Sequence, residues 1–248
     1  METKHFAIVG AGGIGHYIAP LLARFLGYHH PGATLTIIDG DVIEDRNLSR
    51  CFSGDDLGEP KAEILAEVCA EMTPEDALDI RFIDEYIKPD TYERFHRSWL
   101  KDGITIFGCV DNNKSRYYLE EKVSELNNAI LINGGNDLDS GQAQMYVRKD
   151  GEDLTPPISH FAPEILSEGD PYNIFPGEED CSKEYEARPQ LSLANAGVAM
   201  VMLQLFYSQC VDSTPKAESF NEALFSLTGG LGVAFHQREA LPQSETVS

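Results

Sequence analysis

Basic residues are scarce in this sequence: 19 lysines and arginines stand against 41 aspartates and glutamates, which gives a formal net charge of −22 over 248 residues. A surface of this charge repels the phosphates of nucleic acids, so we exclude nucleic-acid binding and expect attraction to a basic protein partner. Five cysteines are present, but no two have C-x-x-C spacing. That argues against a structural zinc site and favours free thiols.

Long uninterrupted hydrophobic runs are also missing. The longest apolar stretch, 191–207, is broken by Ser192, Asn195 and Gln204, so it is typical of a buried or interface helix and not of a membrane span. Nothing at the N-terminus resembles a signal peptide, because the chain enters an apolar strand almost at once. We therefore expect a cytoplasmic protein with no membrane contact. Its length fits one large α/β domain, with or without an appended subdomain.

Strands and helices alternate over the first half of the chain. This pattern predicts an α/β fold, a Rossmann-like doubly wound and mostly parallel sheet. Gly10, Asp39 and Asp111 each follow a predicted strand, and ligands of open α/β sheets bind at the carboxyl ends of strands. The predicted strands are 6–9, 34–38, 78–83, 104–110 and 129–133, and the predicted helices are 14–26, 60–72, 91–100 and 114–126.

The pattern changes after residue 140, where 142–147 favours an antiparallel strand. Residues 150–189 have little periodicity, and from Asp150 to Glu186 eleven acidic residues accompany one lysine. A loop of this length is usually functional or disordered. A helix at 191–209 and strands at 223–227 and 232–236 follow. We thus divide the chain into a nucleotide-binding core (1–149), an acidic loop (150–189), a C-terminal helix and antiparallel strands that complete the same domain (190–236), and a flexible tail (237–248).

The glycine loop Gly-Ala-Gly-Gly-Ile-Gly carries the first sign of chemistry, through Gly10, Gly12, Gly13 and Gly15. Gly10 permits a tight turn, Gly12 lets backbone N–H groups approach a phosphate, and Gly15 lets the helix pack on the strand. Read alone, the loop is also compatible with a turn that serves packing only. Asp39 ends the second strand, where an acidic residue binds ribose hydroxyls, and Asp41 is the better candidate for a solvated turn carboxylate.

Polar residues downstream extend the site. Asn47, Arg50 and Lys61 would place an amide and two cations beside a triphosphate, where nucleotidyl transfer needs positioning and charge neutralisation. Each alone would be an ordinary surface residue. Asp111 is a candidate Mg²⁺ ligand, or else the N-cap of the following helix, a role that Asn112 fills equally well. Together these residues indicate ATP with Mg²⁺.

Five segments in this order and spacing are similar to the ThiF/MoeB/HesA family, relatives of the ubiquitin-activating enzymes. They are Gly-Ala-Gly-Gly-Ile-Gly (10–15), Asp-Gly-Asp (39–41), Asn-Leu-Ser-Arg (47–50), Gly-Glu-Pro-Lys (58–61) and Cys-Val-Asp-Asn (109–112). The resemblance covers roughly residues 5–135. It implies adenylation by ATP of the C-terminal carboxylate of a ubiquitin-like or sulfur-carrier protein whose Gly-rich tail passes under a crossover loop.

The same resemblance implies roles for residues and an oligomeric state. Asp39 would hold the ribose, Asn47, Arg50 and Lys61 would contact the phosphates, and Asp111 would organise Mg²⁺ and be essential, with Asp41 and Asn112 beside them. Residues 150–189 stand where the crossover loop is expected, and a homodimer is implied. The chain departs from the family pattern in Arg50-Cys51 for the usual Arg-Gln, in the missing C-x-x-C pairs, and in lacking an N-terminal arginine-bearing helix.

Cys181 is the candidate nucleophile. The pair Cys181-Ser182 is similar to the Cys-Thr of ubiquitin-activating enzymes, whose cysteine forms a thioester with the ubiquitin-like protein. Neighbouring acids, Glu178, Glu179 and Asp180 among them, disfavour a thiolate. The alternative is therefore a loop cysteine without chemistry, and Cys51 is a lesser candidate.

Two other functions remain open. An NAD(P)-dependent oxidoreductase would account for the glycine loop and Asp39 but leaves Arg50, Lys61 and Asp111 without a shared role. A non-catalytic ThiF-like scaffold subunit would keep the fold and bind a partner, although the retained charged residues argue against lost chemistry. The sequence favours an ATP-dependent adenylyltransferase that activates a ubiquitin-like or sulfur-carrier protein.

Overall fold

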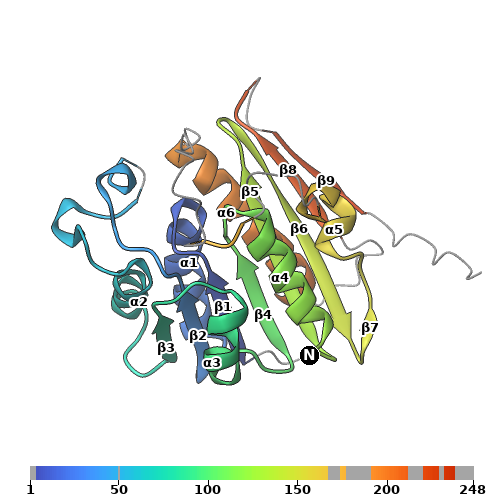
Figure 1. Cartoon of the computed structure of the whole chain (residues 1–248), viewed down its shortest axis with the longest axis horizontal. Helices are drawn as coiled ribbons and strands as arrows, with labels where there is room; N and C mark the ends of the chain where they lie inside the picture. Colours follow the sequence, from blue (N-terminus) through green and yellow to red (C-terminus); the bar gives the residue numbers. More distant parts are fainter. Residues whose placement is uncertain are drawn as a thin grey trace, which may run out of the picture.

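The computed structural model describes residues 4–49, 51–166, 174–176, 191–211, 220–228 and 232–237. Within these residues one nine-stranded sheet has the order β3-β2-β1-β4-β5-β6-β8-β9, with β7 paired to β6 (Figure 1). The first five strands in that order are parallel, as in a Rossmann fold. They are β1 (His5–Val9), β2 (Ala33–Ile38), β3 (Leu78–Ile83), β4 (Ile104–Gly108) and β5 (Ala129–Asn136). The predicted parallel core is confirmed.

Antiparallel strands extend the sheet on its other side, also as predicted. These are β6 (Ser140–Lys149), β7 (Glu152–Asp153), β8 (Glu222–Ser226) and β9 (Gly232–His236). β5 and β6 are longer than the predicted strands, because their pairing continues through Gly134 and Gly135, which carry no apolar pattern. Part of the stretch predicted as an irregular acidic loop forms short elements, namely β7, helix α5 (Ile158–Phe161) and the 3₁₀ helix η3 (Pro163–Leu166).

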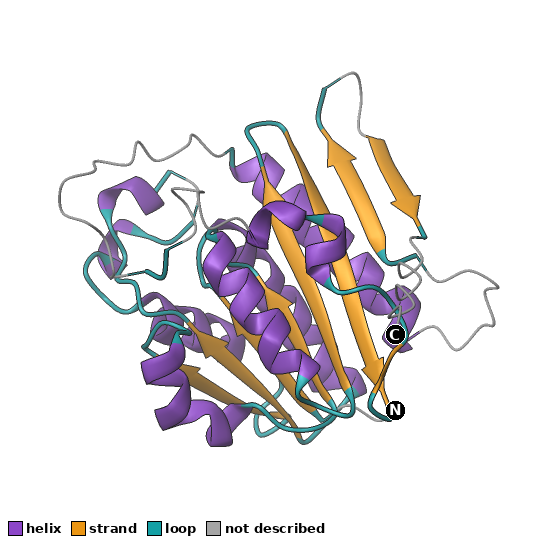
Figure 2. Cartoon of the chain, turned by 45° about the vertical axis from the view of Figure 1, so that its right-hand side comes forward, coloured by secondary structure: helices purple, strands orange, loops and turns teal. Residues whose placement is uncertain are grey.

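Helices cover both faces of the sheet (Figure 2). Alternation along β1 sends Phe6 and Ile8 into one hydrophobic cluster and Ala7 and Val9 into the other. The first cluster includes side chains of α1 (Gly13–His29), α2 (Lys61–Glu71) and α6 (Ser192–Phe206), and the second those of α3 (Pro89–Trp99), α4 (Asn113–Ser124) and α5. A short π-helical turn, η4 (Tyr207–Val211), continues α6. No helix in the described ranges is long and apolar enough to cross a membrane.

The direction of α6 bears on the site. At its C-terminal end the Phe206 ring contacts the rings of Phe6 and Phe107, with centroids 6.0 and 5.6 Å apart, and Phe6 lies near the amino end of β1. At its N-terminal end Asn195 packs against Gly13, the first residue of α1. The N-termini of α1 and α6 therefore meet at the edge of the sheet where the parallel strands end.

Candidate functional site

The glycine loop leaves no room for side chains at two positions. Gly10 has φ +99°, and a Cβ there would lie 2.7 Å from the Cys109 backbone at the end of β4. A Cβ on Gly15 would lie 1.9 Å from the carbonyl oxygen of Gly10, so the first turn of α1 closes directly onto the loop. Gly12 is different, because nothing lies within 4 Å of the position its Cβ would take. The loop is tightly packed underneath and open at Gly12.

The N-terminus of α1 is suited to bind an anion. Its N-cap residue, Gly12, makes no side-chain capping bond, and the first turn contains no acidic residue. The first backbone N–H groups of a helix lack partners inside the helix, and they carry the positive end of its dipole. A phosphate is the usual ligand of such a loop and helix start.

Asp39 ties this loop to the end of β2. Its Oδ2 accepts a hydrogen bond from the Ala11 N–H at 2.6 Å, and its Oδ1 accepts one from the Asp41 N–H at 2.8 Å. Burial and the nearby Asp41 carboxylate raise the pKa of Asp39 to about 6, although Lys61 and the two N–H groups oppose that shift. The carboxylate predicted for a ribose is thus already bonded to the loop predicted for the phosphates.

Asp41 holds Lys61 in an ion pair. The Nζ of Lys61 lies 2.6 Å from Asp41 Oδ2, and the lysine side chain is 6% exposed while that of Asp41 is 41% exposed. Tyr86, which follows β3, donates its hydroxyl to Asp41 Oδ1. Burial pushes the pKa of Asp41 upward, but Lys61 and the Tyr86 hydrogen bond outweigh it and hold that pKa below its usual value. The solvated turn carboxylate predicted at Asp41 is instead the partner of the predicted phosphate lysine.

Backbone pairing explains why Lys61 reaches Asp41 across the intervening residues. The Lys61 N–H donates to the Asp41 carbonyl at 3.0 Å, and the Ile43 N–H donates to the Glu59 carbonyl at 2.9 Å. A β-bridge between Val42 and Pro60 lies between these bonds. The chain therefore leaves the sheet after Asp41 and comes back at residues 59–61, where it pairs with residues 41–43. Helix α2 begins there, at Lys61.

The segment between them carries Asn47 and projects to the left of α1 in Figure 1. It contains the 3₁₀ helices η1 (Asp45–Asn47) and η2 (Gly54–Asp56). Asn47 is buried, and its Oδ1 accepts the Glu44 N–H at 2.9 Å in a capping box. Among the described residues, no hydrogen bond joins Asn47 to Asp39, Asp41 or Lys61. Arg50 lies outside the described residues.

Asp111 is exposed at the turn after β4. The N-cap of α4 is Asn112, whose Oδ1 accepts the Ser115 N–H at 2.8 Å, so Asp111 is not needed as a cap. Arg116 braces this turn, because its Nε and Nη2 donate to the Val110 carbonyl at 3.2 and 3.0 Å. Burial lowers the pKa of Arg116, and the Asp111 carboxylate opposes that shift.

Cysteines add little to the site in the described ranges. Cys51, Cys69 and Cys109 are buried and form no disulfide. Burial raises the pKa of Cys69 to about 12 and that of Cys109 further still, so both remain protonated at neutral pH. Cys181, the predicted nucleophile, lies outside the described residues.

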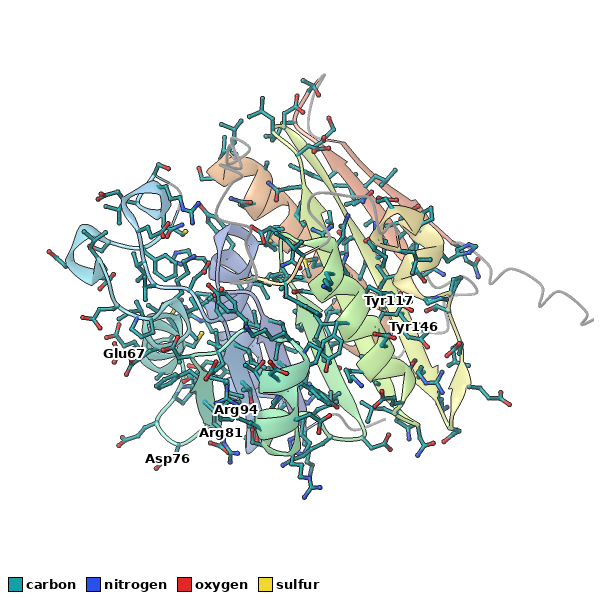
Figure 3. The ribbon with its side chains drawn as sticks, viewed as in Figure 1. Glu67, Asp76, Arg81, Arg94, Tyr117 and Tyr146 are labelled. Carbon is teal, nitrogen blue, oxygen red and sulfur yellow. The ribbon has the colours of Figure 1, made fainter. Side chains whose placement is uncertain are left out.

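Three polar residues of this edge were missed in the sequence: Tyr86, Arg116 and Asn195. Arg116 had a signal, since it stands on the first turn of the helix that follows Asp111, and Asn195 was visible only as an interruption of an apolar run. Tyr86 had none, because it meets Asp41 through the fold. Two other basic side chains, Arg81 and Arg94, which are labelled in Figure 3, form ion pairs with Asp79 and Glu85.

The sheet order and the glycine loop define a Rossmann-type α/β domain, and comparisons with known proteins show to which family it belongs. The sequence pattern of the ThiF family matches residues 1–171. The chain is 27% identical over 177 residues to ubiquitin-like modifier-activating enzyme 7 of Homo sapiens, a match that covers 70% of this chain and 17% of that enzyme. It is 31% identical over 94 residues to the tRNA threonylcarbamoyladenosine dehydratase of Escherichia coli K12, covering 37% of this chain and 32% of that protein.

Solved structures show the same fold. The crystal structure of E. coli MccB with ATP aligns with a TM-score of 0.64 at 18% identity, over 98% of this chain and 66% of MccB. That of PaaA aligns with a TM-score of 0.63 at 18% identity, over 95% of this chain and 73% of PaaA. The chain belongs to the ThiF family, and it spans under a fifth of the human enzyme's own length.

Proposed function

We propose that this protein binds ATP and activates the C-terminal carboxylate of a ubiquitin-like or sulfur-carrier protein by adenylation. One observation carries the proposal: Asp39 is bonded to the glycine loop while Lys61, paired with Asp41, lies beside the same strand end. An NAD(P) site would use the loop and Asp39 alone. A buried lysine at that place is suited to neutralise phosphate oxygens during nucleotidyl transfer.

The residues present fit the nucleotide. The open face at Gly12 and the uncapped N-terminus of α1 suit its phosphates, and Asp39 retains lone pairs for the ribose hydroxyls. Asn47 has committed its Oδ1 to the backbone, so its Nδ2 is the group proposed to face a phosphate. Arg50 is proposed as the second cation of the phosphate set.

Asp111 fits Mg²⁺ only together with the nucleotide. The described residues contain no group of three or more His, Cys, Asp or Glu side chains able to hold a metal ion. Mg²⁺ is commonly held by one or two carboxylates plus substrate phosphates and water, which an exposed Asp111 beside the loop permits. Bound there, the ion would neutralise the phosphates, while Arg116 keeps the Asp111 turn in place.

The proposed reaction has two stages. A carboxylate oxygen of the partner's C-terminus forms a bond to the α-phosphorus of ATP, and the bond from that phosphorus to the leaving pyrophosphate breaks. In the second stage the sulfur of Cys181 attacks the acyl carbon, AMP departs with the bonding electron pair, and the thiol proton is lost to solvent. The chain's own residues hold both reactants in line and neutralise charge.

The partner is proposed to carry a Gly-rich C-terminal tail, because the carrier proteins of the family that the sequence resembles have such a tail. The net charge of −22 favours a basic partner surface. We also propose a homodimer and a cytoplasmic location. Membership of the ThiF family supports the Gly-rich partner tail and the homodimer.

ATP–pyrophosphate exchange tests the first stage, measured with and without ubiquitin-like proteins that end in Gly-Gly. Non-reducing gels of the wild type and of Cys181→Ala test the second, with Cys51→Ala as the matched control. We expect carrier-dependent exchange and a DTT-sensitive adduct that Cys181→Ala abolishes and Cys51→Ala retains. Exchange without an adduct would leave adenylation alone. No exchange with any carrier would contradict the proposal and favour the scaffold or, if NAD binds, the oxidoreductase.

A further inference from the structure

Asn195, in the first turns of α6, has a buried side-chain amide that makes no hydrogen bond to any described residue. The residue is completely buried, and neither its Nδ2 nor its Oδ1 has a hydrogen-bond partner among the described residues. Burying an unpaired amide is unfavourable, so native proteins pair almost all such groups. An exception calls for a missing partner, such as a ligand or an ordered water.

The amide points at the glycine loop. A Cβ built on Gly13 would lie 2.2 Å from Asn195 Nδ2 and 2.9 Å from its Oδ1, so the amide occupies the space that any side chain at Gly13 would need. Gly13 is the first residue of α1, at the helix start suited to phosphate. The absence of a side chain at Gly13 is therefore what allows Asn195 to approach the loop.

Two helix N-termini meet at this point. α6 also begins without a side-chain cap, at Leu191, and without an acidic residue in its first turn. Its C-terminal end is fixed far away by the Phe206 contact with Phe6, so its N-terminal end lies beside that of α1. The positive ends of two helix dipoles and an unpaired amide donor thus converge, which favours an anion over a neutral ligand.

We propose that Asn195 is a second, separate phosphate contact of the nucleotide site, with Nδ2 donating to a phosphate oxygen held at the glycine loop. This inference rests on the proposed function in taking ATP as the ligand. It adds a residue from α6, beyond the N-terminal core, to the nucleotide site. The other reading is that Asn195 only fills space between α1 and α6.

Substitutions separate the two readings. Asn195→Leu keeps the volume and removes the unpaired amide, and Asn195→Asp keeps the shape and places a carboxylate where the phosphate is proposed to lie. Thr105→Val is the matched control, because Thr105 on β4 is completely buried with an unpaired Oγ1 in the described structure but faces no glycine loop. All three would be measured for melting temperature and for affinity to ATP, pyrophosphate and adenosine by calorimetry.

We expect Asn195→Leu to melt at or above the wild-type temperature, since it removes an unpaired amide, yet to bind ATP and pyrophosphate roughly tenfold more weakly. Asn195→Asp should bind both more weakly still, because two anions would face each other. Affinity for adenosine, which has no phosphate, should be unchanged in both. Thr105→Val should also melt at or above the wild-type temperature and should bind all three ligands as the wild type does.

Unchanged ATP affinity in both Asn195 variants would overturn the inference, as would an equal loss of adenosine affinity, which indicates a distorted loop. A raised KM for the carrier protein with unchanged ATP affinity would also overturn it, in favour of a contact to the carrier's carboxylate. If the wild type binds pyrophosphate in an Asn195-dependent manner but not ATP, the proposed function fails while the phosphate contact stands. Binding of neither ligand would refute both.

Discussion

The two sides of the candidate site differ in how closely their side chains are bonded to one another. On the β2 side, Asp39 accepts two backbone N–H groups and Asp41 accepts Lys61 and Tyr86. On the β4 side, Asp111 is exposed, and the helix that follows is capped by Asn112. One side is a closed network of partly buried charges, and the other presents a single carboxylate to solvent.

The difference indicates a division of labour. A network held by several hydrogen bonds is a rigid receptor, and altering it should change stability together with binding. An exposed carboxylate that caps nothing contributes little to stability, so altering it should change chemistry alone. Four substitutions, taken from the largest expected effect to the smallest, test whether this contrast holds.

Asp111→Asn should lower ATP–pyrophosphate exchange by roughly 100-fold or more, because the proposed Mg²⁺ loses its carboxylate ligand. The melting temperature should stay near the wild-type value, because the side chain is exposed and Asn112 supplies the cap. Exchange assays and thermal denaturation check both. Wild-type exchange in this variant would remove Asp111 from the proposed chemistry.

Lys61→Met should affect both properties, as expected on the closed side. It leaves Asp41 with Tyr86 but without its cation, which should destabilise the fold by about 1–3 kcal/mol, and it should lower exchange roughly tenfold or more. Urea denaturation and exchange kinetics measure the two effects. The double variant Lys61→Met/Asp41→Asn should recover much of the stability and none of the exchange; recovery of neither would argue that Lys61 contributes through packing instead of charge.

Asp39→Asn should change how stability depends on pH. The pKa of Asp39 is raised from 3.8 to about 6 in the fold, so the folded state binds more protons and wild-type stability falls as pH rises through that window. The loss is up to about 3 kcal/mol and should disappear in Asp39→Asn. Asp41 has a lowered pKa, so its contribution makes stability rise with pH. That contribution falls at pH values below the usual pKa of aspartate, outside this window.

Denaturant unfolding of the wild type and Asp39→Asn at pH 4.5 and pH 7 measures this slope. A variant that keeps the wild-type slope would show that another group titrates there. Binding of adenosine should weaken in the variant at pH 7, because the amide replaces a charged acceptor for the ribose. At pH 4.5, below the pKa of Asp39, the wild-type carboxyl is neutral and the difference should shrink.

Asn112→Ala should have the smallest effect and serves as the control for Asp111→Asn one residue away. Loss of the N-cap bond to Ser115 should cost about 1 kcal/mol, or roughly 2–4 °C in melting temperature, with exchange within about twofold of wild type. Calorimetry and the exchange assay check it. A collapse of exchange would show that the cap and the carboxylate act together, contrary to the contrast drawn above.

Much of the fold was predictable from the sequence. The parallel core, its antiparallel extension and the C-terminal helix follow from alternating periodicities that local chain geometry imposes. The short elements at 152–166 were not predictable, because two to four residues carry too little periodicity and their stability comes from contacts such as Glu120 with Ser159.

Candidate site residues that belong to a sequence motif were predictable. Residues that meet only because distant elements pack together were not. The glycine loop, Asp39 and Asp111 are separated along the chain, yet each follows a strand, which the strand pattern already implied. Lys61, the first residue of α2, was found through its motif. Three contacts depend on side-chain directions between elements, which spacing along the chain does not encode. They are the ion pair of Lys61 with Asp41, the hydrogen bond of Arg116 to the Val110 carbonyl, and the approach of Asn195 to Gly13.

By itself, then, the sequence determined the order of elements, the edge at which a ligand site forms and the family to which the chain belongs, because periodicity and glycine placement are local constraints. The tertiary structure alone decided that Lys61 pairs with Asp41, that Asn112 rather than Asp111 caps α4, and that α6 brings to the glycine loop an amide with no partner among the described residues. Those facts depend on which buried polar groups find partners across distant segments, and such pairing is set only when the core closes.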